Sequence, residues 1–148
     1  MSGGGAGLRD DVSLRERAQA ALEERWPRAR LGELEPLPGG ISSLTFSAGV
    51  AGAPVERVVV KVAPPGLEPV RNRDVLRQAR VLRTLHGAPG VSIPAVLAED
   101  AAQPPLFVME HVDGQSFEPK WDVSESPPAT AVVGARARAA ARMLAALA

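Results

Sequence analysis

The chain has 148 residues, and its 45% hydrophobic content is enough to build the core of one domain, which excludes a fully disordered chain. Seventeen basic side chains balance seventeen acidic ones, so no net charge attracts nucleic acid or an anionic membrane surface. The absence of cysteine excludes disulfides, thiolate metal sites and cysteine nucleophiles.

The amino-terminal sequence MSGGGAGLRDD is not typical of a secretion signal, because no basic segment is followed by an apolar one. No stretch of about eighteen consecutive apolar residues suggests a membrane-spanning helix. Tyrosine is absent and aromatic residues make up only 3% of the chain, which argues against stacking on single-stranded nucleic acid. We therefore expect a cytoplasmic protein that binds neither membrane nor nucleic acid.

The first expected elements are a disordered tail over residues 1–12 and then a helix. The tail is rich in glycine and cannot bury enough surface to become ordered. Ser13 and Glu16 have the spacing of a capping box, and Pro27 ends the helical pattern. Between these signals, apolar residues recur at four-residue spacing, at Leu14, Ala18, Leu22 and Trp26.

Residues 31–62 change to short apolar runs separated by glycine and proline, which predicts three strands. The runs lie in LGELEPLPGG, ISSLTFSAG and VERVVVKV. The separators at 49–54 and 64–66 contain turn residues. Such short connections favour antiparallel neighbours.

A second helix is predicted over residues 74–86, where apolar side chains return to helical spacing. Asn72 or Asp74 can cap its start, and Gly87 followed by Pro89 ends it. The arginines of this helix are interpreted as a solvated face, because well-spaced charges do not make a basic stripe.

Two further strands are predicted in IPAVLAE and PLFVMEHV, joined by a hairpin turn at residues 100–104. A polar, proline-containing segment follows over residues 113–128. The chain then becomes rich in alanine, which predicts a last helix over residues 130–148 with an apolar stripe on one side.

The stretch PGGISSLTF is a candidate phosphate-binding turn. Gly39 and Gly40 allow a close approach of the backbone to a ligand, and successive amides in such a turn can face an anion. Ser42 and Ser43 would add hydroxyl donors. The alternative is an ordinary hairpin turn, since the stretch matches neither common glycine-rich phosphate motif.

Lys61 is the second candidate, because the chain contains fifteen arginines and only two lysines. Strand alternation places Lys61 and Val59 on the face opposite to Val58, Val60 and Val62. A compact ammonium group suits phosphate oxygens. The alternative is a solvated lysine on an edge strand.

The third candidate is the end of the last strand, where backbone groups at Glu110 and Val112 could pair with a flat heterocycle. The alternative is an ordinary strand end. Neither histidine has a second ligand at metal-binding spacing. We interpret His86 as a helix cap and His111 as a surface residue.

A glycine turn, a lysine strand, a helix, two strands and a linker follow one another in the small lobe of kinase-like folds. Over about residues 30–118 the chain resembles the aminoglycoside phosphotransferase family, whose members phosphorylate hydroxyl groups of small molecules. GGISSLTF looks like its GG-x-S-N-L-T-Y stretch, VVVKVAPPG like its lysine strand with PP-x-G, and LFVMEHVDG like its F-x-V-M-E-x-V-x-G linker. LRQARVLRTL and IPAVL look like its R-E-x-R-V-L helix and V-P-V-P strand.

The resemblance implies an α+β fold. Residues 13–112 would form a kinase-like N-lobe, a five-stranded antiparallel sheet with one packed helix, preceded by the amino-terminal helix. Residues 113–148 would be a linker and the first helix of a large lobe that is otherwise missing.

The resemblance also implies a nucleotide site for ATP. The residues implied to hold the phosphates are Gly39, Gly40, Ser42 and Ser43 of the loop, together with Lys61. The backbone of Glu110 and Val112 would contact adenine. Gln78 occupies the position of the family glutamate that pairs with the lysine, and it cannot neutralise an ammonium group. Ser43 replaces the usual asparagine.

No catalytic residue and no magnesium ligand can be assigned, because the family's H-G-D-x-x-x-x-N loop is absent. His86 and Gly87 are followed by Ala88, and no aspartate follows Asp122. We interpret the chain as the nucleotide-binding N-lobe of a small-molecule kinase that uses ATP and magnesium, not catalytic alone, and cut from a longer enzyme or a truncated gene product. One candidate acceptor is a hydroxyacyl thioester, because PP-x-G resembles the phosphotransferase domains found beside acyl-CoA dehydrogenases.

Two alternatives stay open. One is a non-catalytic binding or interaction module, which the glutamine at position 78 favours. The other is an unstable fragment that self-associates through the apolar stripe of its last helix.

Overall fold

The computed structural model describes residues 5–38, 42–114 and 128–147. The chain divides into two compact units. The first, called here the sheet unit, comprises residues 1–84 and 94–111, and the second comprises residues 85–93 and 112–148. All residues that line the candidate site below belong to the sheet unit.

The sheet is antiparallel throughout and confirms the predicted α+β class. Its main strands follow the order β1-β3-β4-β6-β5, and β2 pairs with another part of β3. The strands are β1 (Arg30–Leu31), β2 (Glu35–Pro36), β3 (Leu44–Ala51), β4 (Arg57–Val62), β5 (Val96–Asp100) and β6 (Leu106–Glu110). Because β4 lies between β3 and β6, the strand that carries Lys61 is central and not an edge.

The first expected strand, in residues 31–40, is instead two short strands along β3. Leu31 pairs with Val50 and Glu35 pairs with Ser47, so four steps on one side span three steps on the other. The extra residue interrupts the ladder as a β-bulge does. Gly32 lies where the backbones approach closely, and its N–H donates to the carbonyl oxygen of Gly49 at 2.9 Å.

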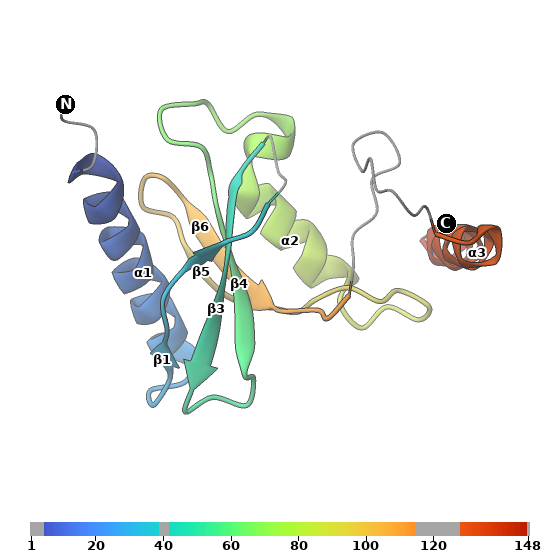
Figure 1. Ribbon diagram of the computed structural model, residues 1–148, viewed down its shortest axis with the longest axis horizontal. Helices are drawn as coiled ribbons and strands as arrows, with labels where there is room; N and C mark the ends of the chain where they lie inside the picture. The colour runs from blue at the N-terminus through green and yellow to red at the C-terminus, as the bar shows by residue number, and fades with distance from the viewer. Residues whose placement is uncertain (1–4, 39–41, 115–127, 148) are drawn as a thin grey trace. The chain divides into compact units, whose positions relative to one another are not determined.

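Helix α1 (Gly5–Arg25) covers one side of the sheet, and α2 (Val75–Leu85) covers the other (Figure 1). The apolar spacing predicted for α1 is confirmed, because its buried residues Leu14, Ala18 and Leu22 share a core cluster with the central strands. The predicted start was wrong, since residues 5–12 are helical and the helix begins before Ser13. Extending a helix costs less than nucleating one, and alanine, leucine and arginine in this stretch are good helix formers.

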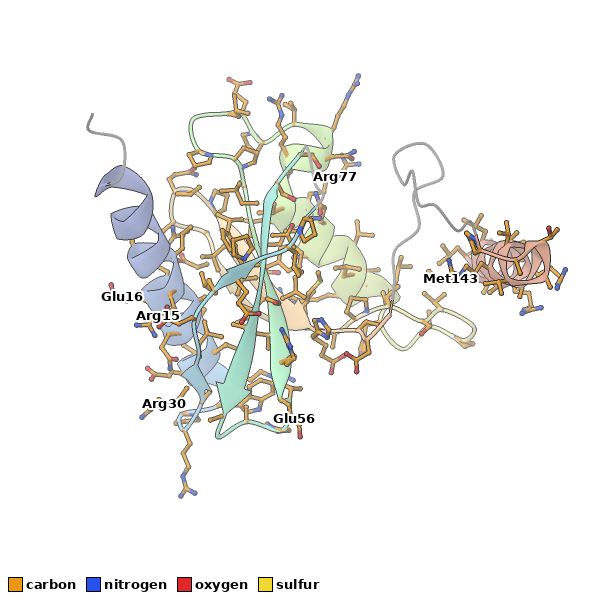
Figure 2. The ribbon with its side chains drawn as sticks, in the orientation of Figure 1. Arg15, Glu16, Arg30, Glu56, Arg77 and Met143 are labelled. Carbon is orange, nitrogen blue, oxygen red and sulfur yellow. The ribbon has the colours of Figure 1, made fainter. Side chains whose placement is uncertain are left out.

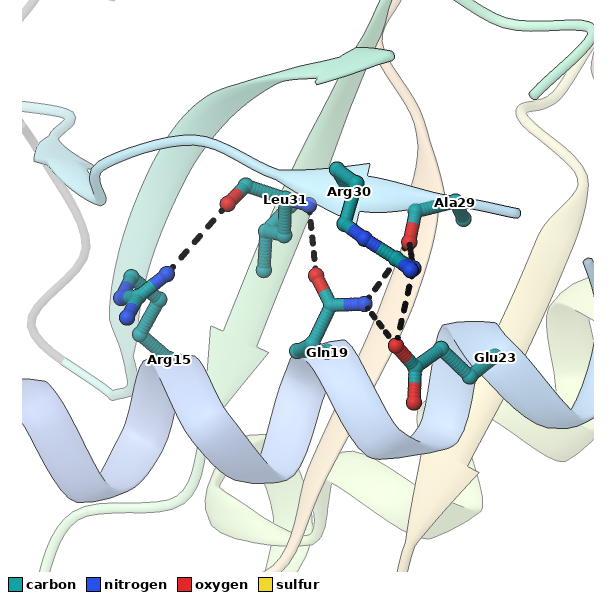
Figure 3. A network of polar contacts seen from close by, with 6 residues as sticks. All are labelled: Arg15, Gln19, Glu23, Ala29, Arg30 and Leu31. Atoms are coloured by element: carbon teal, nitrogen blue, oxygen red, sulfur yellow. Dashed lines mark hydrogen bonds and ion pairs between the residues drawn. The ribbon is translucent and has the colours of Figure 1, made fainter. Parts of the chain in front are cut away.

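A polar network fastens β1 to α1 (Figure 3). The side-chain oxygen of Gln19 accepts the N–H of Leu31 at 2.6 Å, and its amide donates to the carbonyl oxygen of Ala29 at 2.8 Å. The same amide also contacts Glu23, which pairs with Arg30 at 3.1 Å. Gln19 thus satisfies backbone groups of a two-residue strand, which is too short to hold its own place.

Helix α2 (Val75–Leu85) follows a 3-10 turn, η1 (Arg71–Arg73). Of the two predicted caps, Asp74 caps the helix, because its Oδ1 accepts the N–H of Arg77 at 2.9 Å. Val75 and Ala79 are fully buried in a second core cluster on this side of the sheet. The predicted stop is confirmed by Gly87, which has a φ of 81°.

The second unit contains helix α3 (Thr130–Ala145), which confirms the predicted last helix. None of its residues is buried, and exposed apolar side chains include Val132, Val133 and Leu144. Among the described residues, no helix combines the length and apolar character needed to cross a membrane.

Candidate functional site

A pocket of about 650 Å³ opens in the sheet unit between the α2 side of the sheet and the start of α2. One part of its lining is polar and contains Lys61, Arg71, Asn72, Arg77 and Gln78. The other part is apolar and contains Val81, Leu82, Pro94, Phe107 and Met109. The lining therefore combines a cationic region with an apolar wall, and none of its described residues is acidic.

Lys61 reaches this pocket from the central strand β4. Its cross-strand neighbours are Thr45 on β3 and Phe107 on β6. The predicted alternation is confirmed, because Val60 and Val62 belong to the core cluster under α1, whereas Lys61 lines the pocket on the opposite face. The edge-strand alternative is wrong, since both sides of β4 are paired.

The ammonium group of Lys61 is half-buried, and this burial lowers its pKa below the ordinary value. No hydrogen bond or ion pair joins it to another residue in the described part of the chain. A partly desolvated cation without a counter-charge is costly. An anion that enters the pocket would remove that cost.

Gln78 lines the same pocket from α2, but no hydrogen bond joins these two described residues, Gln78 and Lys61. Its amide nitrogen donates to the carbonyl oxygen of Asn72 at 2.6 Å. This bond ties the first turns of α2 to the backbone that precedes the helix. Gln78 therefore stabilises the pocket wall, and the charge of Lys61 is not neutralised by it.

The serine loop enters β3 at the end of the sheet where Lys61 lies. Ser43 is buried, with 5% of its surface exposed, and precedes Leu44, which pairs with Val62. Neither Ser42 nor Ser43 lines the pocket. The predicted glycine pair, Gly39 and Gly40, lies outside the described residues.

The predicted heterocycle contacts at the end of β6 lie in different units. The N–H of Glu110 donates to the carbonyl oxygen of Ala95 at 3.0 Å, so this group already has a ladder partner. The carboxylate of Glu110 accepts the N–H of Ala95 at 3.1 Å. Val112 belongs to the second unit, where its side chain is 65% exposed.

Two arginines of the site, Arg71 and Arg77, are not among the residues predicted from the sequence. Arg77 is exposed, as expected for the solvated face of the helix, but it also lines the pocket. Arg71 lines the pocket as well. Arg83, expected to be solvated, pairs with Glu99 at 2.6 Å and joins α2 to β5. The cap at Asp74 gives a signal for Arg77, because it places that residue in the first turn of α2. No sequence signal reveals the left-handed backbone of Arg71, whose φ is 55°.

This arrangement suits an anionic group attached to an apolar or flat body. Cations line one region and aliphatic and aromatic side chains line the other. No group of three histidine or acidic side chains in the described residues could hold a metal ion. The cationic and apolar side chains of the lining can bind such a ligand and neutralise its charge.

A family model described as phosphotransferase enzyme family matches residues 33–148, which include every residue that lines the pocket. No curated protein matches the chain.

Proposed function

The chain belongs to the phosphotransferase enzyme family, and from this premise we propose that its sheet unit binds the nucleotide of a small-molecule kinase. The nucleotide is ATP, whose terminal phosphoryl group goes to a hydroxyl of the acceptor in this family's chemistry. The kinase-like α+β fold is consistent with this role.

The observation that carries the proposal is the state of Lys61. Its ammonium group is half-buried on a central strand, has no partner among the described residues and lines a pocket without acids. A triphosphate supplies the missing negative charge, and a charge-assisted hydrogen bond to a phosphate oxygen is stronger than one between neutral groups. Lys61 is thus our proposed phosphate-binding residue.

The remaining nucleotide contacts rest on the family resemblance. Gly39, Gly40, Ser42 and Ser43 would cover the phosphates, and the burial of Ser43 beside the Lys61 end of the sheet is compatible with that position. The carbonyl oxygen of Glu110 and the backbone of Val112 would contact adenine. The N–H of Glu110 is not available for this, since it pairs with Ala95.

Magnesium does not fit the described side chains of this site. Mg²⁺ prefers carboxylate, water and phosphate oxygens, and the pocket lining offers no carboxylate. The sequence also has no H-G-D-x-x-x-x-N run that would supply a catalytic aspartate. We therefore assign nucleotide binding to these residues and assign no step of phosphoryl transfer to them.

The acceptor is proposed from Pro64, Pro65 and Gly66, which follow β4 after Ala63 and are similar to the family's PP-x-G. Its resemblance to the phosphotransferase domains beside acyl-CoA dehydrogenases favours a hydroxyacyl thioester, which would react in the cytoplasm. Phosphate transfer from labelled ATP to a set of small hydroxylated molecules tests the class of acceptor.

A second candidate function is a binding module without turnover. The hydrogen bond from Gln78 to Asn72 favours it, because the side chain that could have paired with the lysine is neutral and is used elsewhere. In that case the chain binds the nucleotide and transfers no phosphate. A radiolabelled product formed by highly purified protein would exclude this second function.

Isothermal titration calorimetry with ATP tests the proposed function. We expect Lys61→Ala to weaken ATP binding by about tenfold or more, because one charged hydrogen bond is lost. Arg80→Ala is the matched control, since Arg80 is exposed on α2 and does not line the pocket. Equal affinity of wild type and Lys61→Ala would remove Lys61 from the site.

A further inference from the structure

Three cationic side chains from three elements line the same pocket. Lys61 comes from β4, Arg71 from η1 and Arg77 from the first turn of α2. None of them has an ion-pair or side-chain hydrogen-bond partner among the described residues, and no acid lines the pocket. Like charges that share one pocket without a counter-charge oppose one another.

Some of the other arginines of the sheet unit form ion pairs. Arg17 contacts Asp100 at 2.6 Å, and Arg83 contacts Glu99 at 2.6 Å. Arg57 is close to Glu35 at 3.5 Å. Exposed arginines outside the pocket, such as Arg28 and Arg80, also form no ion pair among the described residues. What distinguishes Arg71 and Arg77 is that they share one pocket with Lys61.

The backbone of Arg71 adds a second observation. Its φ of 55° is in the left-handed region, where glycine or asparagine is favoured and arginine costs energy. Such a conformation persists only where the surrounding structure imposes it, and it is found more often at ligand sites than elsewhere. Figure 2 shows Arg77 at the end of α2 that adjoins this turn.

We propose that Arg71 and Arg77 form, together with Lys61, a three-cation clamp for a chain of phosphate groups, which selects ligands by the number of phosphates they carry. The proposal rests on the proposed function where the phosphate chain belongs to a nucleotide. The same chemistry fits an inorganic tripolyphosphate. A ligand with a single phosphate would leave part of the positive charge without a partner.

With Gln78 in the lining, the clamp should bind phosphate groups more tightly than it would with an acidic residue at position 78. A glutamate there would cancel one of the three positive charges, whereas the amide leaves all three available to the ligand. A guanidinium group can bind two phosphate oxygens at once, and two arginines on neighbouring elements could hold successive phosphates. The affinity should fall as salt rises, because both arginines are exposed.

The test compares ATP, ADP, AMP and inorganic tripolyphosphate by calorimetry. The variants are Arg71→Asn, Arg77→Gln and the double variant, with Arg80→Gln as the control on the same helix. Asparagine tolerates the backbone conformation of Arg71, so this variant removes the charge without adding strain. Arg77→Gln changes one exposed side chain and keeps a good helix former.

We expect each single variant to weaken binding of ATP and tripolyphosphate by about threefold to tenfold, and AMP by less than about twofold. The double variant should therefore lose most of the preference for ATP over AMP, while Arg80→Gln keeps it. Thermal unfolding of each variant verifies that it is folded, and Arg77→Gln alone suffices should the double variant fail to fold.

An unchanged ATP-to-AMP ratio in folded Arg77→Gln and Arg71→Asn would overturn the clamp. If Lys61→Ala weakens ATP binding and the arginine variants do not, the clamp is wrong and the proposed function stands. Wild-type protein that binds tripolyphosphate but not ATP would support the clamp and contradict the nucleotide function. Binding of neither ligand would contradict both.

Discussion

The side-chain amide of Gln78 donates a hydrogen bond of 2.6 Å to the carbonyl oxygen of Asn72, within the lining of the pocket that contains Lys61. This bond fixes a neutral side chain in the pocket wall and leaves the lysine without an acidic partner among the described residues. The positive charges of Lys61, Arg71 and Arg77 in the described lining are therefore not neutralised at position 78, and we expect the pocket to prefer anions.

Gln78→Glu tests this relationship. A carboxylate at this position would stabilise the protonated amine, so we expect the pKa of Lys61 to rise. Nuclear magnetic resonance of the lysine side chains measures this directly, because the chain has only two lysines and Lys120→Arg assigns the signals. Gln78→Met, which adds no charge, is the control. A Lys61 pKa that is the same in both variants would contradict the account.

The affinity for ATP should depend on pH in one direction. Burial lowers the pKa of Lys61 below 10.5, the ordinary value for lysine, so as pH rises the folded protein loses this charge earlier than a fully solvated lysine would. ATP binding should be strongest below the lowered pKa and weaken as pH rises through it. Calorimetry from neutral to alkaline pH follows this change. Lys61→Ala should lack the alkaline loss, and an identical loss in that variant would assign it to another group.

We expect Arg17 to stabilise the fold more than a typical charged residue on the surface does. Its Nε contacts Asp100 at 2.6 Å, and its NH2 group donates to the carbonyl oxygens of Ala102 and Pro104 at 2.8 and 2.9 Å. We expect Arg17→Gln to lower the free energy of unfolding by about 1–3 kcal/mol, measured by urea denaturation, because three acceptors, two of them partly buried, lose their charged donor. Arg28→Gln, an exposed residue, is the control and should change it little.

The contribution of the same ion pair should disappear in acid. Burial alone would raise the pKa of Asp100, but the hydrogen bonds from Arg17 and Ala102 and the charge of Arg17 outweigh it, so the pKa is lowered. The stabilisation is then complete above the unfolded value of about 3.9 and is lost as pH falls through the folded value. The difference in unfolding free energy between wild type and Arg17→Gln should shrink below about pH 4. A constant difference would contradict this.

Gly52 and Gly66 provide a matched pair of backbone tests. Both have positive φ, 73° and 71°, so alanine is strained at either position. At Gly52 an added Cβ would also collide with the carbonyl oxygen of Arg28, whereas nothing lies near it at Gly66. We expect Gly66→Ala to cost about 1 kcal/mol and Gly52→Ala clearly more, by thermal unfolding. Equal melting temperatures of the two variants would argue against the close packing of Gly52 against the backbone of Arg28.

The spacing of apolar residues was sufficient to predict which face of a strand or helix is buried, where the segment has one buried face. The alternation in VERVVVKV placed Lys61 on the face opposite to the α1 core, and the cap at Asp74 located the start of α2. The family resemblance was needed to propose which residues along the chain belong to one nucleotide site. These features depend on local patterns that are present in the sequence itself.

Other features depend on contacts between distant segments. The bulge that divides β1 from β2 reflects the close approach of Gly32 to Gly49, and the helical start of α1 at Gly5 has no capping signal. The place of Arg71 in the pocket follows from a backbone angle that no sequence pattern encodes. Helical spacing alone also assigned Arg77 to solvent, because it cannot show that a pocket adjoins that face.

Lysine-selective nuclear magnetic resonance during an ATP titration tests the central claim most directly. In the Lys120→Arg variant Lys61 is the single remaining lysine, so its side-chain signal needs no further assignment. We predict that this signal shifts and saturates with ATP, and that its pKa rises in the complex because the phosphates stabilise the ammonium. A Lys61 signal that stays unchanged while calorimetry shows ATP binding would contradict the account.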